Sequence, residues 1–138
     1  MRLVFFSFCM LCVSCLFSQT DVSIVLNNMN DQEKSWNKGD IFGFMTHYWQ
    51  SDSLKFIGSK GVTYGWQKTL NNYLKSYPNK DAMGVLKFTI IESTQLSETN
   101  IYVIGKWELQ KEKPVSGHFT LLWRKINGAW LVVADHTS

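Results

Sequence analysis

Asp135 is the residue whose type and position in this sequence point most directly to chemistry. It follows the apolar run 131–134, so its carboxyl group is expected at the end of a buried strand. Burial disfavours the charged form of a carboxyl group and raises its pKa, which suits it to remove a proton from a substrate. The alternative is a solvated carboxylate that pairs with a lysine or caps a turn.

Two histidines, His118 and His136, are the other candidates for acid–base chemistry. Both lie near the dipeptide Asn127-Gly128, which predicts a β-hairpin that places their strands side by side. Asp135, His118 and His136 are therefore the candidate catalytic residues. A hydrogen-bonded structural or surface role is the simpler interpretation for each histidine.

The register of this hairpin decides which of these groups meet, and two registers are open. With a two-residue turn, His118 lies opposite Thr137, and Asp135 is its diagonal neighbour on the same face. With a three-residue loop, His118 lies opposite His136, and Asp135 points to the other face together with Phe119. The first register allows a His118–Asp135 dyad, and the second allows a His118/His136 pair.

Aromatic residues predict a ligand pocket around the same carboxyl group. We expect Tyr48, Trp49, Trp107 and Asp135 to line the open end of the domain, with His118 nearby. Aromatic rings with one carboxylate suit a ligand that is flat, is cationic or carries an acidic proton. The alternative is that the rings pack against each other in a dry core.

Other site chemistries have no signature in the sequence. Two histidines alone make a poor zinc site, and no glycine-rich phosphate loop, GxSxG elbow or HExxH motif occurs. The cysteines are confined to positions 9, 12 and 15, inside the leader described next. We therefore expect neither a metal nor a cofactor, and a fold that needs no disulfide.

Residues 1–19 have the features of a secretory signal peptide. A single positive charge at Arg2 precedes a short uncharged apolar run, and polar residues follow at once. Cleavage near Ser18-Gln19 would leave residues 20–138 as one exported domain, periplasmic or extracellular. A lipid anchor at Cys15 is the alternative form of processing.

Charge and length limit the classes of partner. The chain has 138 residues, enough for one domain, and a formal net charge of +3. Its lysines are scattered rather than clustered, so nucleic acid is not an expected partner. No membrane association is expected beyond the export signal.

Hydrophobic spacing predicts the elements that must position these residues. Helical periodicity covers 21–38, 41–49 and 66–77, so that Tyr48 and Trp49 end the second helix. Strand-like alternation covers 54–57, 62–64, 85–92, 101–109, 117–126 and 129–137. Helices followed by an antiparallel meander predict an α+β domain whose twisted sheet wraps around three helices and leaves a concave cavity.

The order of several motifs resembles the nuclear transport factor 2-like superfamily, and its SnoaL-like branch in particular. The motifs are the stretch 36–40 between two helices, Gly65 before the third helix, the hairpin segment 127–130 and the ending 135–138. The resemblance covers about residues 21–138. It implies a cone-shaped, cystatin-like roll with a deep pocket, and a homodimer, since dimerisation is frequent in the superfamily.

The resemblance does not by itself imply a reaction, because the superfamily includes cyclases, isomerases, dehydratases, kinase association domains and non-catalytic binders. We expect an exported binding or assembly module that captures a small apolar or aromatic molecule or a partner chain. The alternative is a small cofactor-free cyclase, isomerase or dehydratase that uses an Asp or His as general base.

Overall fold

The computed structural model describes residues 20–138, so the predicted signal peptide 1–19 and the alternative anchor at Cys15 lie outside the described residues. The elements, in chain order, are α1 (Asp21–Asn37), α2 (Ile41–Met45), β1 (Lys55–Gly58), β2 (Gly61–Tyr64), α3 (Trp66–Ser76), α4 (Lys80–Met83), β3 (Val85–Ser97), β4 (Asn100–Gln110), β5 (Val115–Ile126) and β6 (Ala129–Thr137). The predicted α+β class is confirmed. The single-turn helix α4 is an addition that the sequence pattern did not predict.

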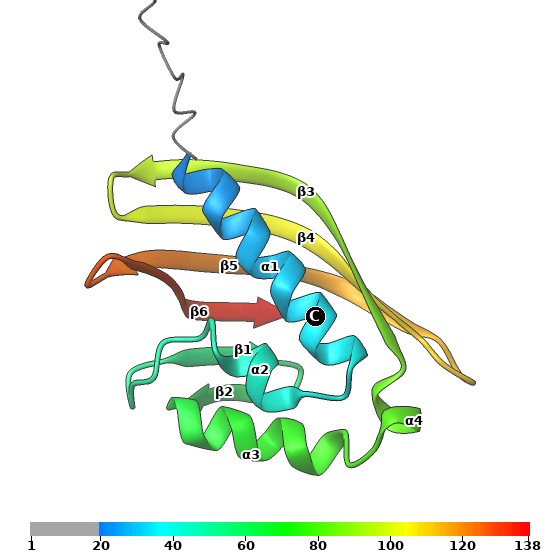
Figure 1. Ribbon diagram of the computed structural model, residues 1–138. Helices are drawn as coiled ribbons and strands as arrows, with labels where there is room; N and C mark the ends of the chain where they lie inside the picture. Colours follow the sequence, from blue (N-terminus) through cyan, green and yellow to red (C-terminus); the bar gives the residue numbers. More distant parts are fainter. Residues whose placement is uncertain (1–19) are drawn as a thin grey trace, which may run out of the picture.

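One curved sheet forms the frame of the domain (Figure 1). Within the described residues its strand order is β2-β1-β6-β5-β4-β3, and neighbouring strands are antiparallel except for β1 and β6, which run parallel. A register shift in β3 between Ile90 and Glu92 marks an irregularity of the kind that bends a strand. The strands β3, β4 and β5 curve around α1, so that the helices lie on the concave side.

The long helix α1 owes its position to one apolar stripe. Val25, Met29 and Trp36 are buried along that stripe, as expected for residues spaced three and four apart on a helix. Thr20 caps the N-terminus by accepting a hydrogen bond from the backbone N–H of Ser23 at 3.2 Å. The helix therefore begins and ends close to the predicted positions.

The second helix is shorter than predicted, and this changes the position of Tyr48. Helix α2 ends at Met45, and the backbone then pairs with β6. The N–H of Trp49 donates to the carbonyl oxygen of Val132, and the N–H of Val132 donates to that of His47, both at 2.9 Å. Because this pairing requires extended backbone, Tyr48 lies beside the sheet in an isolated parallel bridge to Val132.

The last hairpin adopts neither of the two expected registers. Its turn has two residues, because Ile126 pairs with Ala129, but a bulge shifts the pairing further along. Trp123 pairs with Val132 and Leu122 with Ala134, which leaves Val133 as the extra residue. One extra residue reverses the facing of every residue beyond it.

The bulge places Asp135 opposite Leu121 and His136 opposite Thr120. Asp135 therefore shares the inner face with Phe119 and Leu121, and His136 is exposed. His118 pairs with Lys106 of β4 and is also exposed. The structure thus contains neither the His118–Asp135 dyad nor the His118/His136 pair.

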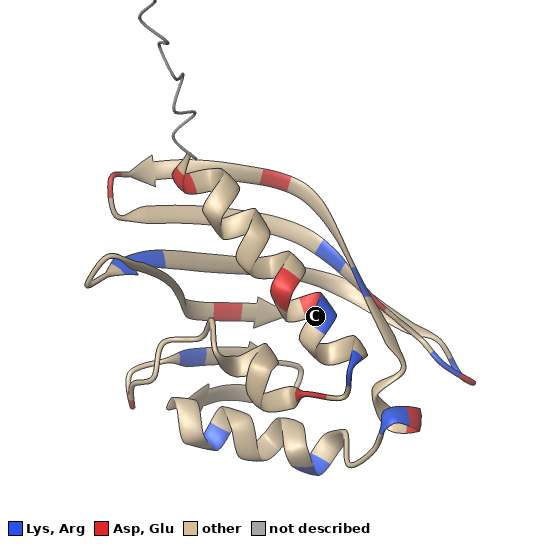
Figure 2. Ribbon diagram, in the orientation of Figure 1, with Lys and Arg blue, Asp and Glu red and all other residues tan. Residues whose placement is uncertain are grey.

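Charged residues of both signs are scattered over the elements (Figure 2). Within residues 20–138, no helix has the length and apolar character needed to cross a membrane. No group of three or more His, Cys, Asp or Glu side chains in the same part of the chain is arranged to hold a metal ion.

Candidate functional site

A cavity of about 650 Å³ lies between the helices and the inner face of the sheet. Its wall is formed by α1, the region of α2, the β1–β2 hairpin, α3 and the inward residues of β3 to β6. Its volume falls within the range of pockets that bury small ligands. Apart from Ser138, the exposed lining residues belong to the β1–β2 hairpin and to α3, so the cavity opens between these elements.

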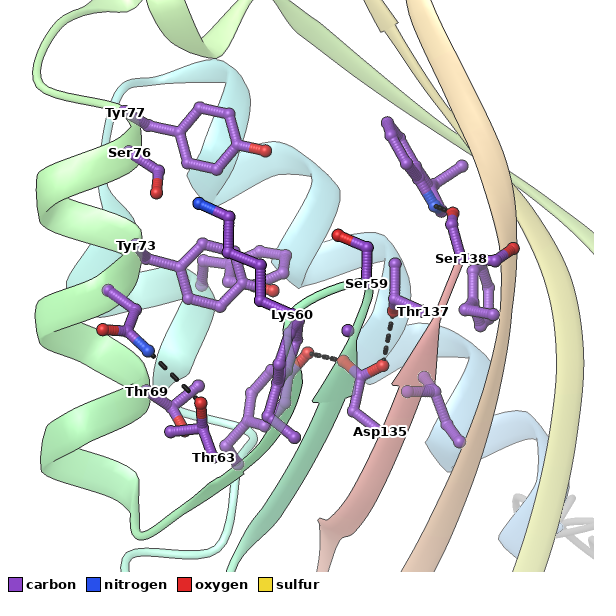
Figure 3. Close-up of a pocket in the computed structure, with 18 of the residues that line it drawn as sticks. Ser59, Lys60, Thr63, Thr69, Tyr73, Ser76, Tyr77, Asp135, Thr137 and Ser138 are labelled. Carbon is purple, nitrogen blue, oxygen red and sulfur yellow. Dashed lines mark hydrogen bonds between the residues drawn. The ribbon is translucent and has the colours of Figure 1, made fainter.

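Asp135 lies at the buried end of this cavity. Only 3% of its surface is exposed. The Tyr48 hydroxyl donates a hydrogen bond to its Oδ2 at 2.6 Å, and the Thr137 hydroxyl donates to its Oδ1 at 2.6 Å (Figure 3). Each carboxyl oxygen therefore has one hydroxyl donor, which fixes the orientation of the group.

Burial raises the pKa of Asp135 above its ordinary value. The hydrogen bonds from Thr137 and Tyr48 act in the opposite direction, as does the charge of His136. Desolvation is the largest of these effects, because the ionised form loses its hydration inside the protein. The site thus holds a carboxyl group that is more basic than one in water.

Two tyrosines lie close enough to Asp135 to respond to its charge. Burial raises the pKa of Tyr48 well above its ordinary value, and the negative charge of Asp135 raises it further. The same two causes, in the same order, raise the pKa of Tyr73. Both phenols therefore stay protonated near the carboxyl group, and that of Tyr48 donates to it.

Aromatic rings form much of the wall. Trp36, Phe44 and Tyr73 meet edge to face, with ring centroids 5.2 to 6.0 Å apart. Phe56 approaches Tyr73 from β1 at 5.8 Å. Figure 3 shows Tyr73 of α3, and Tyr77 just after this helix, extending toward the side where Asp135 lies. These contacts form a rigid apolar surface around a single carboxyl group.

Lysines occur only at the mouth among the residues that line this cavity. Lys60 and Lys75 are exposed. Figure 3 shows Lys60 extending from the β1–β2 turn toward Ser76 and Tyr77 at the end of α3. A ligand would therefore meet positive charge at the entrance and a carboxyl group at the buried end.

A second buried polar group, Gln32, also lines the cavity. It is 1% exposed. Its Nε2 donates to the carbonyl oxygen of Phe44 at 3.3 Å, and this bond defines the orientation of the amide. Its Oε1 has no hydrogen-bond partner. A buried acceptor of this kind is uncommon in native proteins.

Three of the five predicted pocket residues line the cavity, namely Tyr48, Trp107 and Asp135. Trp49 and His118 were expected there as well, and the structure places them elsewhere. Trp49 follows Tyr48 on extended backbone, where successive side chains point to opposite sides. His118 lies on the outer face of β5 because its neighbour Phe119 points inward.

Several cavity residues were not predicted to belong to a site, notably Gln32, Tyr73 and Thr137. A signal for Gln32 was present, since an amide interrupts the otherwise apolar stripe of α1. Tyr73 has the same helical spacing as core residues, so its sequence context does not distinguish it. Thr137 is two residues from Asp135 and therefore shares its face, but only the observed register shows that this face is the inner one.

The architecture and the cavity together define a cystatin-like roll: a curved sheet folded around helices, with a pocket between them. The chain belongs to the nuclear transport factor 2-like superfamily. It is 38% identical to a nuclear transport factor 2-like protein of unknown function from Shewanella oneidensis, with a TM-score of 0.83, over 86% of this chain and 99% of that one. The resemblance to this superfamily that was inferred from the sequence is therefore confirmed.

Two more distant solved structures share the fold. A ketosteroid isomerase-like protein from Erwinia carotovora atroseptica is 17% identical, with a TM-score of 0.71, over 88% of this chain and 97% of that one. A domain of unknown function with a cystatin-like fold from Nostoc punctiforme is 11% identical, with a TM-score of 0.72, over 88% of this chain and 78% of that one. No family model and no curated protein matches the chain.

Proposed function

We propose that this protein is an exported binding module that holds a small, largely aromatic or apolar molecule in its cavity. One observation carries the proposal: a buried carboxyl group, oriented by two hydroxyl donors at 2.6 Å, lies in a cavity of about 650 Å³ with aromatic walls. Aromatic walls supply apolar contact, and a few fixed polar groups select the orientation of the ligand. Export follows from the predicted signal peptide at residues 1–19.

Calorimetric titration of residues 20–138 with 1-naphthalenemethanol, a flat neutral probe, tests this proposal. Ser76 lines the mouth of the cavity, whereas Gln67 is exposed on the same helix and does not line it. We expect Ser76→Trp to weaken binding of the probe and Gln67→Trp to leave it unchanged. A wild-type protein that binds none of a set of neutral and charged naphthalene probes would contradict the proposal.

A second candidate function is supported by the pKa of Asp135, which burial raises. A desolvated carboxylate in an aromatic cavity can remove a proton from carbon, as a cofactor-free isomerase, cyclase or dehydratase requires. The likeness to a ketosteroid isomerase-like structure supports only the fold for this candidate.

The generic carbon acid 5-nitrobenzisoxazole tests the second candidate, because loss of its ring proton opens the ring and changes its absorbance. If Asp135 is a base, the wild-type protein accelerates ring opening and Asp135→Asn abolishes that acceleration. Equal rates for the two proteins would exclude Asp135 as the base for this probe.

A further inference from the structure

The carboxyl group of Asp135 is buried without a positively charged partner. The ion pairs among residues 20–138 join Lys34 to Asp31, Lys106 to Glu108 and Lys125 to Asp21, and none involves Asp135. An ionised carboxylate offers about four acceptor positions. The hydroxyls of Tyr48 and Thr137 occupy one position on each oxygen, so acceptor capacity remains on both.

Gln32, which also lines the cavity, carries a second buried acceptor. Its Nε2 is engaged by the Phe44 carbonyl group, while no protein donor reaches its Oε1. Asp135 and Gln32 therefore both have spare capacity as acceptors, while the hydroxyl of Tyr73, which also lines the cavity, can accept as well as donate. A ligand that satisfies Asp135 and Gln32 must supply N–H or O–H donors, and the carboxylate favours donors that carry positive charge.

The surrounding rings favour the same charge. Trp36, Phe44, Tyr48, Phe56 and Tyr73 line the cavity, and the faces of aromatic rings attract cations, most strongly where water is excluded. The titratable groups near Asp135 are the two neutral phenols Tyr48 and Tyr73, together with His136 on its own strand.

Lys60 and Lys75 are the cations that line the cavity, and both are exposed at its mouth. Solvent and salt screen exposed charges much more than buried ones. Their repulsion of an entering cation is therefore weaker than the attraction of the buried carboxylate. An anion would be attracted by the lysines at the mouth and repelled by the carboxylate at the buried end.

We propose that the ligand is an organic ammonium ion, whose N–H donors bind Asp135, with Gln32 as a further acceptor, and whose apolar body fills the aromatic cavity. This inference rests on the proposed binding function and names the ligand class of that site. It requires a specific order of affinities among ligands that share one body and differ only in the charge of the head group.

The test compares three probes by calorimetry with residues 20–138: 1-naphthylmethylamine, 1-naphthalenemethanol and 1-naphthoate. We expect the amine to bind the wild-type protein at least about tenfold more tightly than the alcohol, and the carboxylate to bind most weakly. In the variant Asp135→Asn, the affinity for the amine should fall to the affinity for the alcohol. Asp31→Asn, which removes the same charge from the exposed face of α1, should preserve the preference.

Equal or tighter binding of the alcohol or the carboxylate by the wild-type protein would overturn the inference and leave the binding function standing. Retention of the amine preference in Asp135→Asn would overturn it as well. Failure of all three probes would contradict the binding function itself. If Gln32→Met leaves the affinity for the amine unchanged, Gln32 does not take part in binding the amine.

A wild-type measurement keeps the test independent of how well Asp135→Asn folds. An alkylammonium stays charged throughout the acid range, whereas Asp135 becomes neutral when its carboxyl group is protonated. Amine affinity should therefore fall as the pH is lowered through the titration of Asp135, while affinity for the alcohol stays constant. An amine affinity that does not change with pH would overturn the inference.

Discussion

The hydroxyl of Tyr48 and the carboxyl group of Asp135 are joined by a hydrogen bond of 2.6 Å across 87 positions of sequence. Tyr48 reaches this position because the chain after α2 pairs with β6 at Val132. Asp135 reaches it because the bulge at Val133 turns its side chain inward. The polar centre of the cavity therefore depends on two backbone features of the same strand.

Replacement of Tyr48 by Phe removes one of the two hydroxyl donors to the buried carboxyl group. We expect the free energy of unfolding to fall by about 1–3 kcal/mol, the usual cost of leaving a buried acceptor without its donor. The pKa of Asp135 should rise further, because the lost bond lowers it in the wild-type protein. Urea denaturation and NMR titration of the carboxyl group measure the two effects.

Tyr64→Phe is the matched control for this substitution, since Tyr64 is 58% exposed. Removal of its hydroxyl should leave both stability and the titration of Asp135 unchanged. If Tyr48→Phe behaves like this control, the bond to Asp135 contributes nothing measurable.

The raised pKa of Asp135 predicts how stability depends on pH. Between its unfolded pKa, near 3.8, and its higher folded pKa, the folded protein holds a proton that the unfolded chain has lost. The contribution of this group to the free energy of unfolding therefore decreases as pH rises through that window, and stays low above it.

Asp135→Asn isolates this contribution, because an amide does not titrate. The stability of the variant relative to wild type should be greater at about pH 7 than at about pH 3, where the carboxyl group is protonated in both states. Thermal or urea unfolding at the two pH values measures the difference. A relative stability that is the same at both values would mean that folding does not shift the pKa of Asp135.

Gly105 of β4 lies beneath the ring of Phe119, and a Cβ added there would collide with that ring. Because Phe119 lines the cavity, Gly105→Ala must displace a cavity wall. We expect a loss of about 1–3 kcal/mol of stability, as for other overpacked cores, and weaker binding of the naphthalene probes. Denaturation and calorimetry test the two results.

Lys106→Ala serves as the control at the adjacent position. Its side chain lies on the outer face, where it pairs with Glu108 while partly exposed, so its loss should change stability by less than about 1 kcal/mol. A Gly105→Ala variant as stable as this control, with unchanged probe binding, would show that Phe119 can move without cost.

Processing of the full-length chain is expected to remove the signal peptide near Ser18-Gln19. A new start at Gln19 or Thr20 keeps the N-cap of α1, because Thr20 accepts the hydrogen bond from Ser23. Intact mass measurement of the exported protein identifies the first residue. A diacylated chain beginning at Cys15 would establish the lipid anchor instead, and an intact Met1 in the cytoplasm would exclude export.

The helices and strands were largely predictable because each depends on local periodicity. Helix α1 combines an apolar stripe with clear ends, and β4 has Ile101, Val103, Trp107 and Leu109 on one face, with Gly105 between them. The buried position of Asp135 was one of two interpretations, since an acidic residue after an apolar strand is compatible with either face.

The partners of Asp135 could not be predicted, because they depend on contacts between distant segments. Periodicity alone extends the second helix to Tyr48, but pairing with Val132 ends it at Met45. The two-residue turn at Asn127-Gly128 was one of the two alternatives left open, but the bulge at Val133 reverses its consequence for Asp135. No local signal in the sequence marks either event.

The bulge at Val133 also has an evolutionary consequence. A descendant that lost the bulge but kept the length of β6 would turn His136 inward in place of Asp135, since the facing of the strand alternates. A descendant that lost Val133 itself would keep the acid in the cavity, because Leu122 would still pair with Ala134. An acidic cavity could thus become a basic one without any substitution, and a codon could disappear from the gene while the acid remained in place.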